Sequence, residues 1–169
     1  GKFNSLIGIV NQCSTSSGKR LLIHRILNPI INIDELNTRY NMITEFRKKT
    51  NDKQYVYNTF ETFLQNILDL ERSHRRMSLG MIQPSEFLSL DISYKNILHI
   101  IDLVNTYNFN NVLIPSNEEI SCFKQYLNEY TSKINMDIIG RYYKDNITEN
   151  IFKEGVFPYI DDIQNKIVN

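Results

Sequence analysis

The spacing of apolar residues constrains the fold of this chain more than any other feature, because it is helical almost throughout. Phe3, Leu6, Ile7 and Val10 show the pattern first, and it returns along most of the 169 residues. Intervals of three and four place apolar side chains on one face of a helix, whereas a half-buried strand alternates them with polar residues. Short alternating runs such as 155–157 could form a local strand, but nothing supports a sheet. The sequence therefore predicts an all-α fold, a multi-helix bundle.

Capping residues and prolines divide this pattern into separate helices. Asn32 and Ser116 are suited to accept the free amides of a helix start, and Glu35 and Glu119 complete a capping-box spacing. Proline disfavours helical geometry in the residue before it and fits the first helical position, so it ends or opens several others. The expected helices cover residues 3–10, 18–27, 32–47, 53–68, 84–107 and 116–135 and a final run from 158, while 69–79 either continues the fourth helix or stands alone.

Composition excludes several classes of protein. Nineteen basic and nineteen acidic residues give zero net charge, which excludes a protein that binds nucleic acid by bulk charge. Apolar residues at 41% exclude wholesale disorder. Two cysteines, Cys13 and Cys122, form no disulfide framework and indicate a reducing, intracellular compartment. The apolar stretch 96–104 is broken by His99 and Asp102, so we expect no membrane span.

Reactive residues are present, but none stands at a spacing that defines a catalytic, cofactor or metal site. The pair Gly18-Lys19 is typical of a phosphate-binding loop, yet that loop needs glycine where Cys13 stands and serine or threonine where Arg20 stands. The three histidines lie far apart, without cysteines at ligand spacing, and we expect His99 to be a hydrogen-bonded residue near the core. There is no nucleophile-elbow pattern. We therefore assign no catalytic, cofactor-binding or metal-binding residue.

Two basic clusters offer contacts to nucleic-acid phosphates. One spans residues 19–25, and the other contains Arg72, Arg75 and Arg76. Arginine at a phosphate gives affinity without base specificity. Acidic residues just before the second cluster offer an alternative, ion pairing within and between helices. Because the net charge is zero, ion pairing is favoured over phosphate binding.

Three stretches of the chain carry motifs in an order found in a known family. They cover residues 11–39, 69–84 and 154–163. The matching positions are Thr15, Gly18, Arg20, Leu22, Pro29, Leu36 and Arg39 in the first stretch, Asp69, Leu70, Glu71 and Arg72 in the second, and Gly155 in the third. Together they resemble the core, or lever, domain of MutS DNA mismatch-repair proteins.

Some positions depart from the family pattern. Arg25 replaces the family's helix tryptophan, Ser17 replaces its methionine, and Asn32 replaces an acidic residue. The chain also has no alanine and is rich in asparagine and isoleucine, which an A+T-rich coding genome favours. These features are similar to the MutS forms of giant viruses and octocoral mitochondria.

The resemblance implies a role in a larger protein rather than a reaction. It implies a helical core domain over residues 1–156 and the truncated start of the lever helix, leading to the clamp, over 157–169. The chain begins with Gly1 and stops within an amphipathic run, so we expect a fragment. The implied role is to couple a DNA-binding clamp to an ATPase domain, both outside the fragment.

By the same resemblance, the full-length parent uses ATP and Mg, acts on double-stranded DNA and forms a homodimer, whereas the fragment is no enzyme and holds no cofactor. Two alternatives stay open at this point. In the first alternative, the chain is a stand-alone helical nucleic-acid-binding module. In the second, it is a scaffold and oligomerisation module. An enzyme of another type is less favoured than either.

The motif residues also predict specific contacts. Gly18 permits a close backbone approach at the turn into a helix. Arg20 and Arg39 lie on otherwise apolar helix faces, where a charged group needs a partner. We expect both arginines to pair with Asp69 or Glu71 and to fasten the early helices to the middle one.

Overall fold

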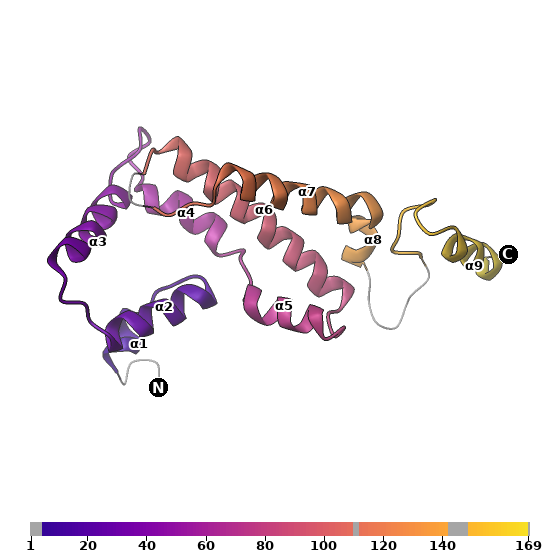
Figure 1. The fold of residues 1–169 in the computed structure, drawn as a ribbon, viewed down its shortest axis with the longest axis horizontal. Coiled ribbons are helices and arrows are strands. Elements are labelled where there is room, and N and C mark those ends of the chain that lie inside the picture. The colour runs from indigo at the N-terminus through magenta and orange to yellow at the C-terminus, as the bar shows by residue number, and fades with distance from the viewer. Residues whose placement is uncertain (1–4, 110–111, 142–148, 169) are drawn as a thin grey trace. The chain divides into compact units, whose positions relative to one another are not determined.

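The computed structural model describes residues 5–109, 112–141 and 149–168. These residues form α-helices joined by turns, without an assigned strand (Figure 1). The helices are α1 (Leu6–Val10), α2 (Ser16–Leu27), α3 (Ile33–Phe46), α4 (Val56–Leu64), α5 (Leu70–Ser78), α6 (Pro84–Thr106), α7 (Asn117–Lys133), α8 (Met136–Arg141) and α9 (Pro158–Val168). The all-α prediction is confirmed.

The chain divides into two compact units that do not follow its linear order. Unit 1 contains Gly1–His74 and Ile92–Ile114, and unit 2 contains Arg75–Asp91 and Pro115–Asn169. Helices α5 and α6 therefore contribute residues to both units. The last helix starts at Pro158, as its amphipathic pattern predicted, and its role as the start of a lever helix stays a prediction.

The core of unit 1 lies where α4 meets α6. Val56, Phe60 and Val104 are at most 4% exposed. The ring of Phe46, at the end of α3, packs edge-on against Phe60 with centroids 5.0 Å apart. By contrast, no residue of α1, α2 or α3 is buried. The helices that carry the first motif thus contribute no fully buried residue, and Phe46 provides the contact of α3 with this core.

The core of unit 2 lies between the start of α6, α7 and α8. Leu90 is 0% exposed and Ile139 is 2% exposed. Asp91 is 2% exposed, and its Oδ1 accepts a hydrogen bond of 2.6 Å from the Tyr130 hydroxyl. The Tyr130 ring also packs edge-on against Phe87, with centroids 5.2 Å apart. This core therefore contains a buried carboxyl group held by a tyrosine.

The predicted helix caps are present, one in full and one in part. Ser116 and Glu119 form a complete capping box at the start of α7. The backbone N–H and the hydroxyl of Ser116 both donate to Glu119 and hold the pKa of its carboxyl below the ordinary value. At α3, the Asn32 side chain accepts the N–H groups of Asp34 and Glu35. The capping interactions thus explain why both helices begin where they do.

Three sequence-based expectations need correction. The fourth helix, expected over 53–68, covers only Val56–Leu64, because Lys53 adopts a positive φ of 61° in the preceding turn and the chain breaks again after α4. Helix α8 was not predicted; the extended backbone at Ile134 ends α7, and the chain turns into a new helix. His99 is exposed rather than near the core, and its ring lies 5.3 Å from that of Phe63.

Candidate functional site

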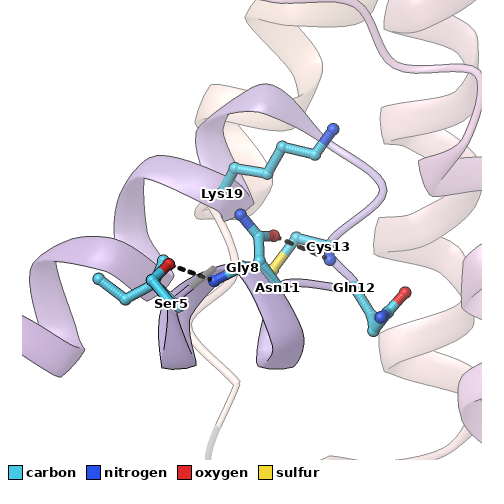
Figure 2. A pocket seen from close by; sticks show the side chains of 7 residues that line it. Ser5, Gly8, Asn11, Gln12, Cys13 and Lys19 are labelled. Carbon is cyan, nitrogen blue, oxygen red and sulfur yellow. Dashed lines mark hydrogen bonds between the residues drawn. The ribbon is translucent and has the colours of Figure 1, made fainter. Parts of the chain in front are cut away.

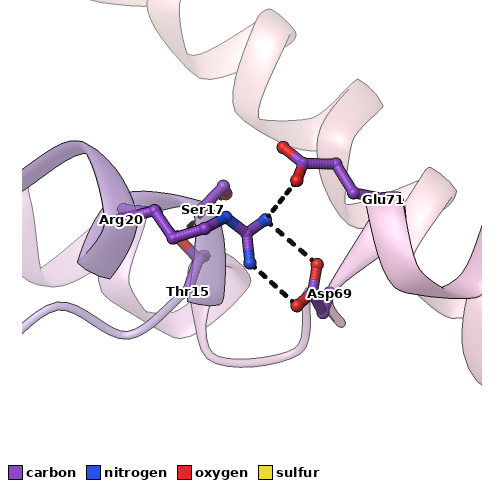
Figure 3. Close-up of polar contacts among 6 residues, drawn as sticks. Thr15, Ser17, Arg20, Asp69 and Glu71 are labelled. Atoms are coloured by element: carbon purple, nitrogen blue, oxygen red, sulfur yellow. Dashed lines mark hydrogen bonds and ion pairs between the residues drawn. The ribbon is translucent and has the colours of Figure 1, made fainter. Parts of the chain in front are cut away.

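An arginine fork joins α2 to the start of α5 within unit 1 (Figure 3). The guanidinium of Arg20 donates from Nη1 to Asp69 Oδ2 at 2.9 Å and from Nη2 to Asp69 Oδ1 at 3.0 Å. Its Nη2 also lies 2.9 Å from Glu71 Oε2. The two parallel bonds to Asp69 give the fixed planar geometry that distinguishes arginine from lysine. We call Arg20, Asp69 and Glu71 the α2–α5 junction.

Asp69 occupies the position just before α5, so its carboxylate serves that helix as well as Arg20. It accepts the backbone N–H of Arg72 in the first turn. The hydrogen bonds from Arg20, together with this backbone bond, hold the pKa of Asp69 below its ordinary value, against the opposing effect of desolvation. One carboxylate thereby links the start of a helix to a contact 49 residues away in the sequence.

Solvent limits how much the junction contributes to stability. The side chains of Arg20 and Asp69 are 45% and 28% exposed, and that of Glu71 is 77% exposed. Exposed ion pairs gain little because water screens them. The junction therefore fixes the position of α2 more than it stabilises the fold.

The pairing prediction is confirmed for Arg20 and wrong for Arg39. Arg39 Nη2 lies 2.6 Å from Glu35 Oε1, one turn earlier on the same helix. A partner four residues away is reached without ordering a second segment, so the local pair forms instead. The Glu35 carboxylate therefore binds Arg39 and does not complete the capping box. The capping contacts described above come from the Asn32 side chain.

The first turn of α2 is closely packed around Gly18. The Thr15 hydroxyl oxygen accepts the Gly18 N–H at 3.0 Å and so caps the helix. A Cβ atom on Gly18 would lie only 2.8 Å from that oxygen and 3.6 Å from Cys13 Cβ. The close approach predicted at Gly18 is confirmed. Gly18 and Lys19 lie inside a helix that follows α1, which is not the strand–loop–helix arrangement of a phosphate loop.

This packing predicts that Gly18→Ala changes the free energy of unfolding in opposite directions in chains with and without the Thr15 hydroxyl. Alanine in a helix is favoured over glycine by about 1 kcal/mol. Losing a threonine cap costs about 0.5–2 kcal/mol. In the natural chain we expect Gly18→Ala to lower the free energy of unfolding, because its Cβ displaces the Thr15 hydroxyl. In a Thr15→Ala chain the same change should raise it, by about 0.5–1 kcal/mol. Urea denaturation of the four proteins measures this, and equal effects in both backgrounds would contradict it.

Ser14 is a contact residue that the sequence did not reveal. Its hydroxyl donates to the Glu61 carboxylate and ties the segment before α2 to α4. The two residues are 47 positions apart, and neither is one of the matching motif positions. Together with the junction, this contact gives the poorly buried α2 two attachments to the rest of unit 1.

The other motif positions lie on helices or in the turns that join them. Leu22, Leu36 and Leu70 are half-buried, and Pro29 follows the residue that ends α2. Gly155 has φ of 84°, a value that glycine tolerates best, and its N–H donates to Asp161 Oδ2 at 2.9 Å. That bond fixes the turn before α9.

The arginines considered for phosphate binding differ in their surroundings. Arg76 Nη2 lies 2.9 Å from Glu86 Oε2 and donates to the Met81 carbonyl at 3.0 Å, so it is already engaged. Arg72 and Arg75 are exposed on α5. Phosphate contacts by these residues stay a prediction.

A pocket of about 510 Å³ lies beside α1 and the start of α2 (Figure 2). Lys19 is the one charged residue among those that line it, and Asn11 Oδ1 within it accepts the Cys13 N–H. The lining residues are Ser5, Ile7, Gly8, Asn11, Gln12, Cys13 and Lys19. Among the residues that the structure describes, no hydrogen bond joins Lys19 to Cys13 or Ser5, and we assign no catalytic role to the pocket.

In the part of the chain that the structure describes, no three His, Cys, Asp or Glu side chains gather as metal ligands would. None of the described helices combines the length and the apolar character needed to cross a membrane.

Fold and site together define a helical domain with an inter-helix junction as its main polar feature. The family model described as MutS domain III matches residues 1–164, and the chain belongs to this family. The motif resemblance noted in the sequence is thereby confirmed.

Three relatives illustrate the similarity. A DNA mismatch repair protein mutS homolog of Acanthamoeba polyphaga mimivirus is 32% identical over 173 residues, which cover 98% of this chain and 14% of that protein. The DNA mismatch repair protein MutS of Borreliella burgdorferi (strain ZS7) is 33% identical over 162 residues, or 93% of this chain and 18% of the relative. A mitochondrial DNA mismatch repair protein mutS homolog of Sarcophyton glaucum is 40% identical over 79 residues, or 47% of this chain and 8% of the relative.

These relatives include a giant virus and an octocoral mitochondrion, as the sequence led us to expect. The chain spans less than a fifth of the length of each. No solved structure shows significant similarity to it.

The lowered pKa of Asp69 predicts how the junction responds to pH. The unfolded chain titrates this group near the ordinary value of about 3.9. The junction's contribution is therefore complete above about pH 4 and is lost as pH falls through the lower folded-state value. We expect Arg20→Ala to lower the Tm by a few degrees near neutral pH and by progressively less in acid. Circular dichroism melts across this pH range measure it, and a Tm difference that does not change with pH would contradict the assignment.

Proposed function

We propose that this chain is the transmission domain of a longer DNA mismatch-repair protein, in which it couples a DNA-binding clamp to an ATPase domain. The observation that carries the proposal is the match to MutS domain III across residues 1–164. The relatives named as DNA mismatch repair proteins support it. The clamp and the ATPase belong to parts of the longer protein outside this chain.

The helices suit a mechanical role. At 1.5 Å per residue, the 23 residues of α6 form a rod of about 34 Å. Packed helices move as rigid bodies, and small shifts can be passed from one to the next. Within unit 1, the arginine fork and the Ser14–Glu61 bond would carry a displacement of α2 to α5 and α4. In this proposal, ATP and Mg, double-stranded DNA and homodimer formation are properties of the longer protein.

The coupling can be measured in the longer protein that contains this segment. We expect Arg20→Glu to leave basal ATP turnover unchanged and to weaken its stimulation by mismatched duplex DNA at least about fivefold. The matched control is Arg25→Glu, a charge reversal on the same helix at an exposed arginine. Full stimulation in Arg20→Glu would remove the junction from the relay. Absence of DNA-dependent ATP hydrolysis in the unaltered longer protein would overturn the proposed function.

The 169-residue chain by itself provides a second test. We expect it neither to hydrolyse ATP nor to discriminate mismatched DNA. ATP hydrolysis by the pure chain would overturn the proposal. Salt-sensitive binding to duplex DNA at low micromolar concentration would favour the stand-alone nucleic-acid-binding module. Self-association in light scattering would favour the scaffold module.

A further inference from the structure

The chain between α4 and α5 is held by a buried serine of α6. The apolar pattern predicted a helix through residue 68, yet α4 ends at Leu64 and α5 begins at Leu70. Within this break, the Leu68 N–H donates to Ser93 Oγ at 3.1 Å, and that hydroxyl donates to the Asn66 carbonyl at 3.3 Å. Ser93 thus bonds two backbone groups of this connecting segment, although it lies 25 residues beyond Leu68 in the sequence.

These two bonds satisfy backbone groups that have no helical partner where α4 ends. A helix end leaves backbone N–H and C=O groups without partners, and such groups are costly when water is excluded. A hydroxyl is suited to the task because it accepts one bond and donates another. Ser93 is 0% exposed, so water has no access to substitute for it. The break in the helix therefore depends on this side chain.

The next residue of α6 holds α5 on the other side of the junction. The hydroxyl of Tyr94, which is 4% exposed, lies 2.6 Å from Nε2 of His74. Leu68 directly precedes Asp69, and His74 follows Glu71 by three positions. The two acidic residues of the junction are consequently bracketed by two contacts to α6.

We propose that Ser93 and Tyr94 are positioning residues that fix Asp69 and Glu71 where the Arg20 guanidinium meets them. Bidentate pairing with arginine requires the carboxylate to hold one orientation. Asp69 lies in a connection whose position is set by Ser93, not by a continuous helix. The inference deepens the relay proposed above and rests on it, because it names the contacts by which α6 governs the α2–α5 junction.

The titration of Asp69 reports directly on its place beside Arg20. We would follow the carboxyl carbon of Asp69 by NMR in the 169-residue chain as pH falls, in the natural protein and in Arg20→Ala. The difference between these two curves defines the effect of the arginine. We expect Ser93→Ala to move the Asp69 titration toward the Arg20→Ala curve by at least half of that difference.

Further variants separate positioning from a general loss of stability. Ser93→Cys has similar volume and only weak hydrogen bonding, so it should shift the Asp69 titration like Ser93→Ala even where the alanine variant fails to fold. Tyr94→Phe should produce a smaller shift in the same direction. Thr106→Ala, which removes a local hydroxyl bond on the exposed side of α6, is the control and should leave the titration unchanged.

An unchanged Asp69 titration in folded Ser93→Cys or Tyr94→Phe would overturn the inference. This experiment uses neither DNA nor nucleotide. Its failure is therefore distinct from failure of the proposed relay, which appears only in the coupling of ATP turnover to DNA.

Discussion

Replacing Phe60 by alanine should lower the free energy of unfolding by about 3–5 kcal/mol, the usual cost of truncating a buried aromatic ring. Phe60 is 4% exposed and has three neighbouring rings, with centroids 5.0 Å away for Phe46, 5.8 Å for Phe109 and 6.2 Å for Tyr107. Removing it leaves a cavity that these rings can fill only in part. Because natural domains are stable by about 5–15 kcal/mol, such a loss is a large share of the total.

A neighbouring residue of the same helix provides the control for Phe60. Tyr57 is 44% exposed on α4, so Tyr57→Ala should cost less than about 1 kcal/mol. Urea denaturation followed by circular dichroism measures both variants. Equal losses in the two would mean that α4 does not carry the core of unit 1.

The second large effect is expected in unit 2, where Tyr130→Phe should cost about 1.5–3 kcal/mol. The substitution removes only the hydroxyl that donates to Asp91 Oδ1 at 2.6 Å, while the ring keeps its place against Phe87. Asp91 is 2% exposed, so water is poorly placed to replace the lost bond. Removing a hydrogen bond from a buried carboxyl group costs more than removing one at the protein surface.

Tyr159→Phe is the matched control for this second prediction, because Tyr159 is 77% exposed on α9. It should leave the midpoint of urea denaturation unchanged. A loss in Tyr130→Phe no greater than in Tyr159→Phe would show that the buried bond contributes nothing to stability.

Local signals in the sequence were sufficient for much of the fold. Spacing of apolar residues predicted the helices, and the caps at Asn32 and Ser116 predicted two of their starts because these interactions span only two or three residues. The break after α4 was not predictable in this way. It depends on Ser93, and no pattern near residues 65–69 indicates a hydroxyl 25 positions further along. The same holds for the division into two units, whose members alternate along the chain.

The junction was predictable only in part. The pairing of Arg20 was predictable because Asp69 and Glu71 belong to the second motif stretch. Arg39 was assigned to the same acids, although Glu35 stood four residues before it on the same helix. A rule that prefers the local partner would have corrected this assignment, since ordering a distant segment costs conformational entropy.

The Asp69 carboxylate contacts both α5 and α2, and this couples the opening of these two contacts. Its carboxylate holds the first turn of α5 through the Arg72 N–H and holds α2 through Arg20. Fraying of that turn reorients the carboxylate and so releases the guanidinium in the same event. Amide hydrogen exchange at the start of α5 and loss of the Arg20–Asp69 contact should accordingly share one opening free energy. Local unwinding of α5 and loss of one of the two attachments of α2 thus become one step.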